Sequence, residues 1–170
     1  FYVFVYTIWL KRKTPQNIVI GGASGALPPV IGWAIATNSI SLESIAFFLI
    51  IFFWTPSHFW ALSLYKADDY KKAGIPMLPV TNGIQDTKKN ILIYSLLMIP
   101  TIVFPYYIGF VGEVFLTLSL LLTFYYNLIC FQLYNYKVGK FNIKKARHIF
   151  SYSIIYLFLI FVFFLVDKVL

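Results

Sequence analysis

One segment of this sequence combines carboxylates, lysines and a histidine at a spacing that suits a phosphorylated ligand. It runs from Trp54 to Val80 and reads WTPSHFWALSLYKADDYKKAGIPMLPV. Asp68 and Asp69 are adjacent carboxylates, and Mg²⁺ takes carboxylate oxygens as ligands while it bridges substrate phosphates. Three lysines near this acidic pair are candidate phosphate contacts: Lys66, Lys71 and Lys72. The segment therefore suits a pyrophosphate that carries a lipid tail, and a simple solvated basic loop is the alternative interpretation.

The residues before the acidic pair predict a polar line along one face of a helix. If the helix continues past Tyr65 and ends before Gly74, a rotation of about 100° per residue places Trp54, His58, Tyr65 and Asp69 on one stripe. A polar line that enters a bilayer is costly unless it faces the interior of a helix bundle. We therefore expect Trp54, His58 and Tyr65 to line a substrate cavity. For His58, a hydrogen-bonded core histidine is the alternative.

Membrane-spanning helices must position these groups. Of the 170 residues, 60% are hydrophobic and only 12% are charged, whereas soluble domains carry about 25% charged residues. Five segments reach the length of about 20 apolar residues that a helix needs to cross a bilayer. They are Ile18–Thr37, Leu42–Tyr65, Ile91–Gly109, Val114–Tyr134 and Ile149–Val166. Phe1–Leu10 is too short and is expected to be the end of a further span. The predicted fold is an all-α, polytopic transmembrane helix bundle.

Basic residues alternate between successive connections and predict the orientation in the membrane. The connections at 11–16, 38–41, 66–90, 110–113 and 135–148 hold three, no, five, no and five lysines or arginines. Because basic loops stay on the cytoplasmic side, the first, third and fifth connections are expected there. The net charge of +8 is therefore interpreted as membrane topology, not as nucleic-acid binding. The single cysteine, Cys130, excludes an internal disulfide and a cysteine-based metal site.

Small residues and prolines predict distortions in the first two spans. Gly21 and Gly25 form a GxxxG spacing, which lets two helices approach closely. Pro28 and Pro29 are expected to bend or break their helix because proline lacks an amide hydrogen, and Pro56 is expected to act likewise in the next span. Distorted helices of this kind suit an intramembrane cavity, with ordinary kinked packing as the alternative.

Three stretches resemble the heme-modifying branch of the UbiA-type family of intramembrane prenyltransferases. They are Tyr6–Trp33, Thr55–Val80 with its AGIPMLPV string, and Arg147–Leu157. The resemblance implies a nine-helix bundle with a central cavity, of which residues 1–170 would form the C-terminal part of a single domain. It also implies transfer of a farnesyl group from farnesyl diphosphate to a vinyl group of heme b, giving heme O, with Mg²⁺ assisting departure of the pyrophosphate.

The resemblance also assigns roles to individual residues. Asp68 and Asp69 match the second acidic, metal-binding segment and, with Lys72, are the expected catalytic groups. The diphosphate contacts it implies are Lys11, Arg12, Lys66 and Lys71. Lys66 stands where many relatives outside the heme branch carry another aspartate, so the number of metal ions at this segment is open. The first acidic segment of the family is absent from these residues and is expected to precede Phe1.

Several partners and alternatives follow from this resemblance. The expected partners are farnesyl diphosphate, heme b and the lipid bilayer, with heme A synthase as an associated enzyme. The expected location is the bacterial cytoplasmic membrane, or alternatively the mitochondrial inner membrane. A prenyltransferase acting on a quinone precursor or a chlorophyll-type ring is a second hypothesis. A membrane transport subunit without catalytic activity is a third, although we find no convincing internal repeat of the kind that transporters contain.

Overall fold

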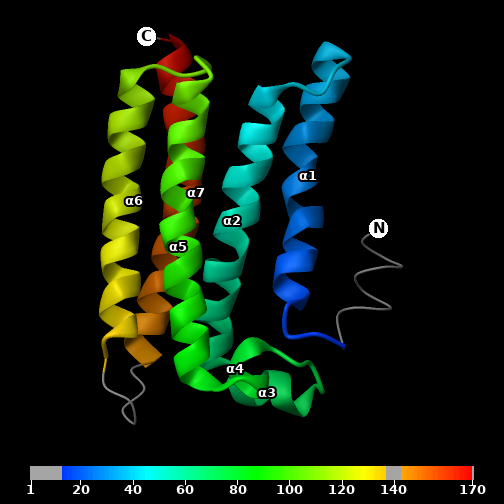
Figure 1. Cartoon of the computed structure of the whole chain (residues 1–170), viewed down its shortest axis with the longest axis vertical. Coiled ribbons are helices and arrows are strands. Elements are labelled where there is room, and N and C mark those ends of the chain that lie inside the picture. Colours follow the sequence, from blue (N-terminus) through cyan, green and yellow to red (C-terminus); the bar gives the residue numbers. More distant parts are fainter. Residues whose placement is uncertain (1–12, 137–142, 170) are drawn as a thin grey trace.

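The computed structural model describes residues 13–136 and 143–169. In these ranges the chain forms helices joined by short connections, with no strand (Figure 1). The helices are α1 (Asn17–Thr37), α2 (Leu42–Tyr65), α3 (Ala67–Lys72), α4 (Leu78–Thr81), α5 (Gly83–Tyr107), α6 (Glu113–Tyr134) and α7 (Ile143–Val169). All but α3 and α4 are long and apolar enough to cross a bilayer. The five predicted spans and the all-α polytopic bundle are confirmed, and the chain is a multi-pass membrane protein.

The ends of two spans differ from those predicted. α5 begins at Gly83 instead of Ile91, and α7 begins at Ile143 instead of Ile149. Hydropathy marks the part of a helix that lies in the bilayer, whereas the backbone hydrogen bonds continue through its polar first turns. The short segment Phe1–Leu10 lies outside the described residues.

α2 is the centre of the described bundle. It packs against α1 on one side and against α5 and α7 on the other, while α6 lies at the outer edge and packs against both α5 and α7 (Figure 1). The core lies among α2, α5, α6 and α7, where Trp60, Phe115, Tyr126 and Tyr156 are completely buried. Among the long helices, α1 contacts only α2. α1 is therefore joined to the rest of the described bundle through its contact with α2.

Hydrogen bonds from aromatic side chains hold the central helices together. Ser57 Oγ donates a hydrogen bond within its own helix, to Trp54 O, and lies 2.7 Å from the Tyr126 hydroxyl. Thr123 Oγ1 likewise donates to Ser119 O and lies 2.9 Å from the Tyr156 hydroxyl. Because each small hydroxyl has used its hydrogen within its own helix, the tyrosine donates in both pairs. These bonds join α2 to α6 and α6 to α7 where no water is present.

One local expectation was wrong. The helix that begins at Leu42 does not continue through the acidic pair, because α2 ends at Tyr65 and Lys66 leaves helical geometry (φ −113°, ψ 19°). α3 then crosses the end of the bundle, so the predicted stripe from Trp54 to Asp69 does not form (Figure 1). Pro28 and Pro29 were expected to bend or break α1, and of these two outcomes the break does not occur, since α1 is helical throughout. Transmembrane helices tolerate proline because local adjustments and neighbouring groups satisfy the freed carbonyls.

Asp167 ties the end of α7 to the start of α6. Its two carboxylate oxygens accept hydrogen bonds from the backbone amides of Gly112 at 2.7 Å and Phe115 at 3.1 Å. These amides belong to the first turn of α6, which has no partner for them within the helix. The neighbouring Lys168 donates to Phe110 O and lies over the Phe110 ring. One turn of α7 therefore caps α6 from outside.

We expect Asp167→Ala to lower the free energy of unfolding by about 1–2 kcal/mol, since it removes an N-terminal cap and leaves two amides without a partner. Glu113→Ala is the matched control, because Glu113 lies in the same turn of α6 but acts only through its charge. Thermal unfolding of both variants in detergent measures the difference. Equal losses in the two variants would contradict the capping role.

The topology can be tested by labelling single cysteines. The α1–α2 connection and the α5–α6 connection lie at one end of the bundle, and α3 lies at the other (Figure 1). With Cys130 replaced by serine, Lys71→Cys should react with an impermeant maleimide from the cytoplasmic side only. Asn38→Cys should react from the opposite side only, as the distribution of basic residues predicts. Labelling of both positions from one side would exclude this topology.

Candidate functional site

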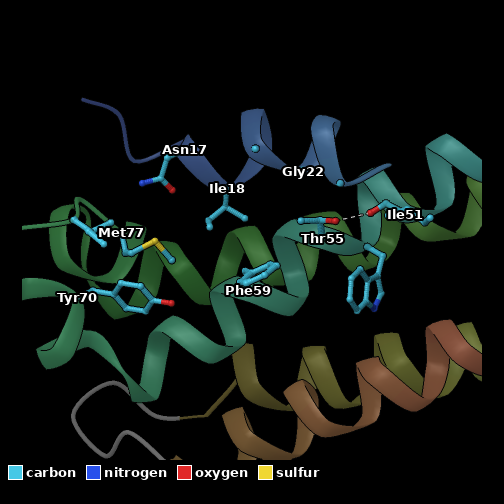
Figure 2. Close-up of a pocket in the computed structure, with 12 residues that line it drawn as sticks. Asn17, Ile18, Gly22, Ile51, Thr55, Phe59, Tyr70 and Met77 are labelled. Atoms are coloured by element: carbon cyan, nitrogen blue, oxygen red, sulfur yellow. Dashed lines mark hydrogen bonds between the residues drawn. The ribbon is translucent and has the colours of Figure 1, made fainter. Parts of the chain in front are cut away.

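A cavity of about 450 Å³ lies between α1 and α2 and is closed at one end by the α3–α4 segment (Figure 2). Its walls are mostly apolar, with Ile18 from α1, Ile51 and Phe59 from α2, and Met77 from the segment after α3. The labelled residues divide along its length: Asn17, Met77 and Tyr70 lie toward one end, and Thr55 and Ile51 toward the other. A cavity of this shape and size suits an elongated apolar ligand.

Glycines on α1 make both the helix contact and the cavity. A β-carbon at Gly22 would lie 3.0 Å from Thr55 Cγ2, so α1 and α2 approach each other tightly at Gly22. Ala26, one turn later, is completely buried. Gly21 and Gly25, which the GxxxG spacing predicted at the contact, line the cavity, and Gly22 both lines it and makes the contact. Small residues of α1 do contact α2, as predicted, but they are Gly22 and Ala26 instead of Gly21 and Gly25. One position along the sequence is a rotation of about 100° around the helix.

The three residues predicted to line the cavity lie on different sides of α2. Trp54 lines it and also donates from Nε1 to Ser153 O at 2.8 Å. His58 is buried on the α7 side, with its ring 4.3 Å from the Trp54 ring and 4.6 Å from the Phe150 ring. Tyr65 also faces α7, where the Arg147 guanidinium lies over its ring. Of the three, the structure brings only Trp54 to the cavity.

The hydrogen bond of His58 is typical of a core histidine. Nδ1 lies 2.7 Å from Ser153 Oγ, and Ser153 Oγ itself donates to Phe150 O at 2.6 Å. Since the serine hydrogen is used in that second bond, His58 Nδ1 is the donor of the first. The alternative interpretation of His58, as a hydrogen-bonded core residue, describes this arrangement.

α3 carries the charged groups beside the closed end of the cavity. Asp68 and Asp69 are exposed, and Asp69 Oδ2 forms an ion pair with Lys66 Nζ at 3.0 Å. Lys71 and Lys72 occupy the last turn of the same short helix and are also exposed. Lys11 and Arg12, the other predicted diphosphate contacts, lie outside the described residues. The charged side chains of α3 therefore lie at the surface of the bundle next to the cavity, and none of them lines its walls.

The donor set on α3 fits a metal ion that is shared with a phosphate ligand. Within the described residues, no three or more His, Cys, Asp or Glu side chains form a group that could hold a metal ion. Asp68 and Asp69 supply only oxygen ligands, and Mg²⁺ commonly takes one or two carboxylates and completes its shell with phosphate oxygens and water. The pair suits such a partial site and does not suit an all-protein cage.

Tyr70 is a cavity residue that the sequence analysis missed. It follows the acidic pair on α3, and its half-buried side chain points into the cavity while Asp68 and Asp69 face solvent (Figure 2). Burial, with a smaller contribution from the neighbouring Tyr65 and Asp69, raises the pKa of its hydroxyl above the usual value. Tyr70 is therefore a neutral hydrogen-bond donor at physiological pH. The available signal was the single aromatic residue between the charged pairs of ADDYKK, because one apolar side chain among charged ones gives a short helix an apolar side.

The fold defines a multi-pass helical membrane protein, with an apolar cavity between α1 and α2 and charged residues on α3 beside it. The sequence model of the UbiA prenyltransferase family matches residues 1–155. The chain belongs to this family.

Curated relatives agree over the whole chain. It is 76% identical over 170 residues to the protoheme IX farnesyltransferase of Pelagibacter ubique, covering 100% of this chain and 56% of the relative. It is 50% identical to the protein of the same name from Parvibaculum lavamentivorans, covering 100% of this chain and 54% of that relative. No solved structure shows a significant match. The chain spans about half the length of the curated relatives it matches.

We expect Gly22→Ala to destabilise the contact between α1 and α2 by about 1–3 kcal/mol, as overpacking does. Gly25→Ala is the matched control on the same helix, because a β-carbon there meets no atom within 4 Å and alanine favours helix by up to about 1 kcal/mol over glycine. Thermal unfolding should therefore shift in opposite directions for the two variants. Adding Thr55→Ser to Gly22→Ala removes the opposing methyl group and should recover part of the loss.

Proposed function

We propose that the protein containing this chain transfers a farnesyl group from farnesyl diphosphate to a vinyl group of heme b, giving heme O. One observation carries the proposal: an apolar cavity between α1 and α2 is closed by the short helix that bears Asp68 and Asp69. A prenyl diphosphate has the same division, with an apolar chain joined to a charged head. The names of the similar proteins, which are protoheme IX farnesyltransferases, support heme as the acceptor.

In this proposal the charged residues of α3 hold the diphosphate. Asp68 and Asp69 would bind Mg²⁺, which supplies positive charge to the departing pyrophosphate. Lys66, Lys71 and Lys72, with Lys11 and Arg12 from the sequence, would contact its oxygens. The ion pair between Lys66 and Asp69 holds the two side chains close together in the absence of ligand. In the proposal, Asp69 would then bind Mg²⁺ and Lys66 would contact the diphosphate. Cations fixed before the reaction stabilise developing negative charge most effectively.

The cavity walls have a separate task in the proposal. As the bond to the pyrophosphate breaks, positive charge develops on the allylic end of the prenyl chain. Ile18, Phe59 and Met77, which line the cavity toward that end, keep water from it, and the aromatic face of Phe59 can stabilise a cation. The terminal vinyl carbon of heme forms the new carbon–carbon bond to the allylic carbon as the bond to pyrophosphate breaks. Water then adds to the positive charge left on the other vinyl carbon and loses a proton, which gives the hydroxyethylfarnesyl group of heme O. We place the whole protein in the bacterial cytoplasmic membrane, with heme A synthase as the proposed associated enzyme.

We expect Asp69→Asn, made in the full-length protein, to lower kcat/KM for heme O formation by about 10²–10³-fold. A loss of about 3–4 kcal/mol is typical when one group that stabilises transition-state charge is removed. Affinity for heme b should stay unchanged, since the carboxylate serves the diphosphate. Asp86→Asn is the control, because Asp86 is an exposed carboxylate on α5 and should react at the wild-type rate.

Chromatography of extracted hemes measures the product, and parallel assays with a quinone precursor test the other acceptor class. Wild-type turnover by Asp69→Asn at saturating Mg²⁺ would contradict the role of the acidic pair. Prenylation of the quinone precursor without any heme O would contradict the proposed acceptor.

A further inference from the structure

We infer that Gly25 sets the longest prenyl chain that the cavity accepts. This inference rests on the proposed function, because it assigns the cavity between α1 and α2 to the prenyl chain of the diphosphate substrate. Gly25 lines the cavity, and a β-carbon built on it meets no atom within 4 Å. Gly25 is exposed at the apolar end of the cavity, so a side chain at this position would extend over that end without displacing any described residue.

The cavity has a polar end and an apolar end, which orients the ligand. Asn17 and Tyr70 lie together at the end next to α3 (Figure 2). Along α1, Gly25 is the lining residue furthest from that end, and along α2 it is Ile51. Eight residues separate Asn17 from Gly25, which is about 12 Å along a helix axis. A ligand with its charged head at α3 must therefore place its tail beside Gly25 and Ile51.

The lining favours a prenyl chain over heme as the occupant. None of the described residues that line the cavity is a lysine, arginine, aspartate or glutamate. Heme b carries two propionates, whose burial without a partner is strongly unfavourable. A prenyl chain has no polar atom beyond its head and can lie against Ile18, Ile51 and Phe59 throughout. The diphosphate head is then left beside the exposed lysines of α3.

The remaining glycine of α1 provides a matched control. Gly32 lies on the same helix, and a β-carbon there also meets no atom within 4 Å, but Gly32 does not line the cavity. Gly25→Leu and Gly32→Leu thus make the same change to the helix and differ in whether the new side chain enters the cavity. Ile51→Ala makes the opposite change, since it removes side-chain volume at the apolar end.

The experiment measures binding of geranyl, farnesyl and geranylgeranyl diphosphates, with Mg²⁺, to the full-length protein in lipid nanodiscs. Gly25→Leu should change the ratio of farnesyl to geranyl affinity by at least about tenfold in favour of geranyl, because excluding even one methylene changes discrimination by that order. Gly32→Leu should keep the wild-type ratio. Ile51→Ala should improve geranylgeranyl binding relative to farnesyl by a similar factor.

The result that would overturn the inference is an unchanged chain-length ratio in both Gly25→Leu and Ile51→Ala. If Gly25→Leu fails to fold, the ratio in Ile51→Ala decides alone. Heme O formation is measured separately on the same preparations. A shifted binding ratio in a protein that prenylates no heme would support the chain-length role of Gly25 and contradict the proposed acceptor, so the two failures are distinguishable.

Discussion

The structure depends on one constraint: polar side chains of α2 lie where no water can satisfy them. Trp54, Ser57 and His58 meet this constraint by hydrogen bonding with the tyrosine of α6 and the serine of α7 that face them. These bonds set the rotation of α2 about its axis. Its opposite face, with Ile51, Thr55 and Phe59, is thereby turned toward α1 and becomes a wall of the cavity. Thr55 satisfies its own hydroxyl by donating to Ile51 O at 2.7 Å.

α1 completes the cavity because its small residues differ in what they face. Gly22 and Ala26 bring the helix against α2, where Thr55 leaves no room for a larger side chain. Gly25, one residue before Ala26, faces open space, and Gly21, one residue before Gly22, lines the cavity. One tight contact thus holds the two helices together while the neighbouring positions keep them apart enough for a ligand. The same residue type therefore serves packing and binding on adjacent sides of one helix.

The end of α2 at Lys66 separates the apolar and charged parts of the candidate site. A helix that continued through the acidic pair would have carried Asp69 along the same line as Trp54 and His58. The change of direction instead lays α3 across the end of the bundle, with Tyr70 toward the cavity and the carboxylates toward solvent. The charges consequently stay hydrated at the membrane surface, where they are stable and where a diphosphate head would also remain.

The sequence by itself determined the five spans, the basic connections on alternating ends, the acidic pair and the family. Each of these depends on hydropathy, charge or short motifs, which are properties of neighbouring residues. Only the tertiary structure decided that His58 faces Ser153, that Gly22 and not Gly25 meets α2, and that Tyr70 enters the cavity. The predicted stripe failed because helical periodicity holds only while the helix continues. Which face of a helix meets which neighbour is decided by packing and hydrogen bonding between residues far apart in the chain, and in a uniformly apolar span the local pattern carries almost no record of it.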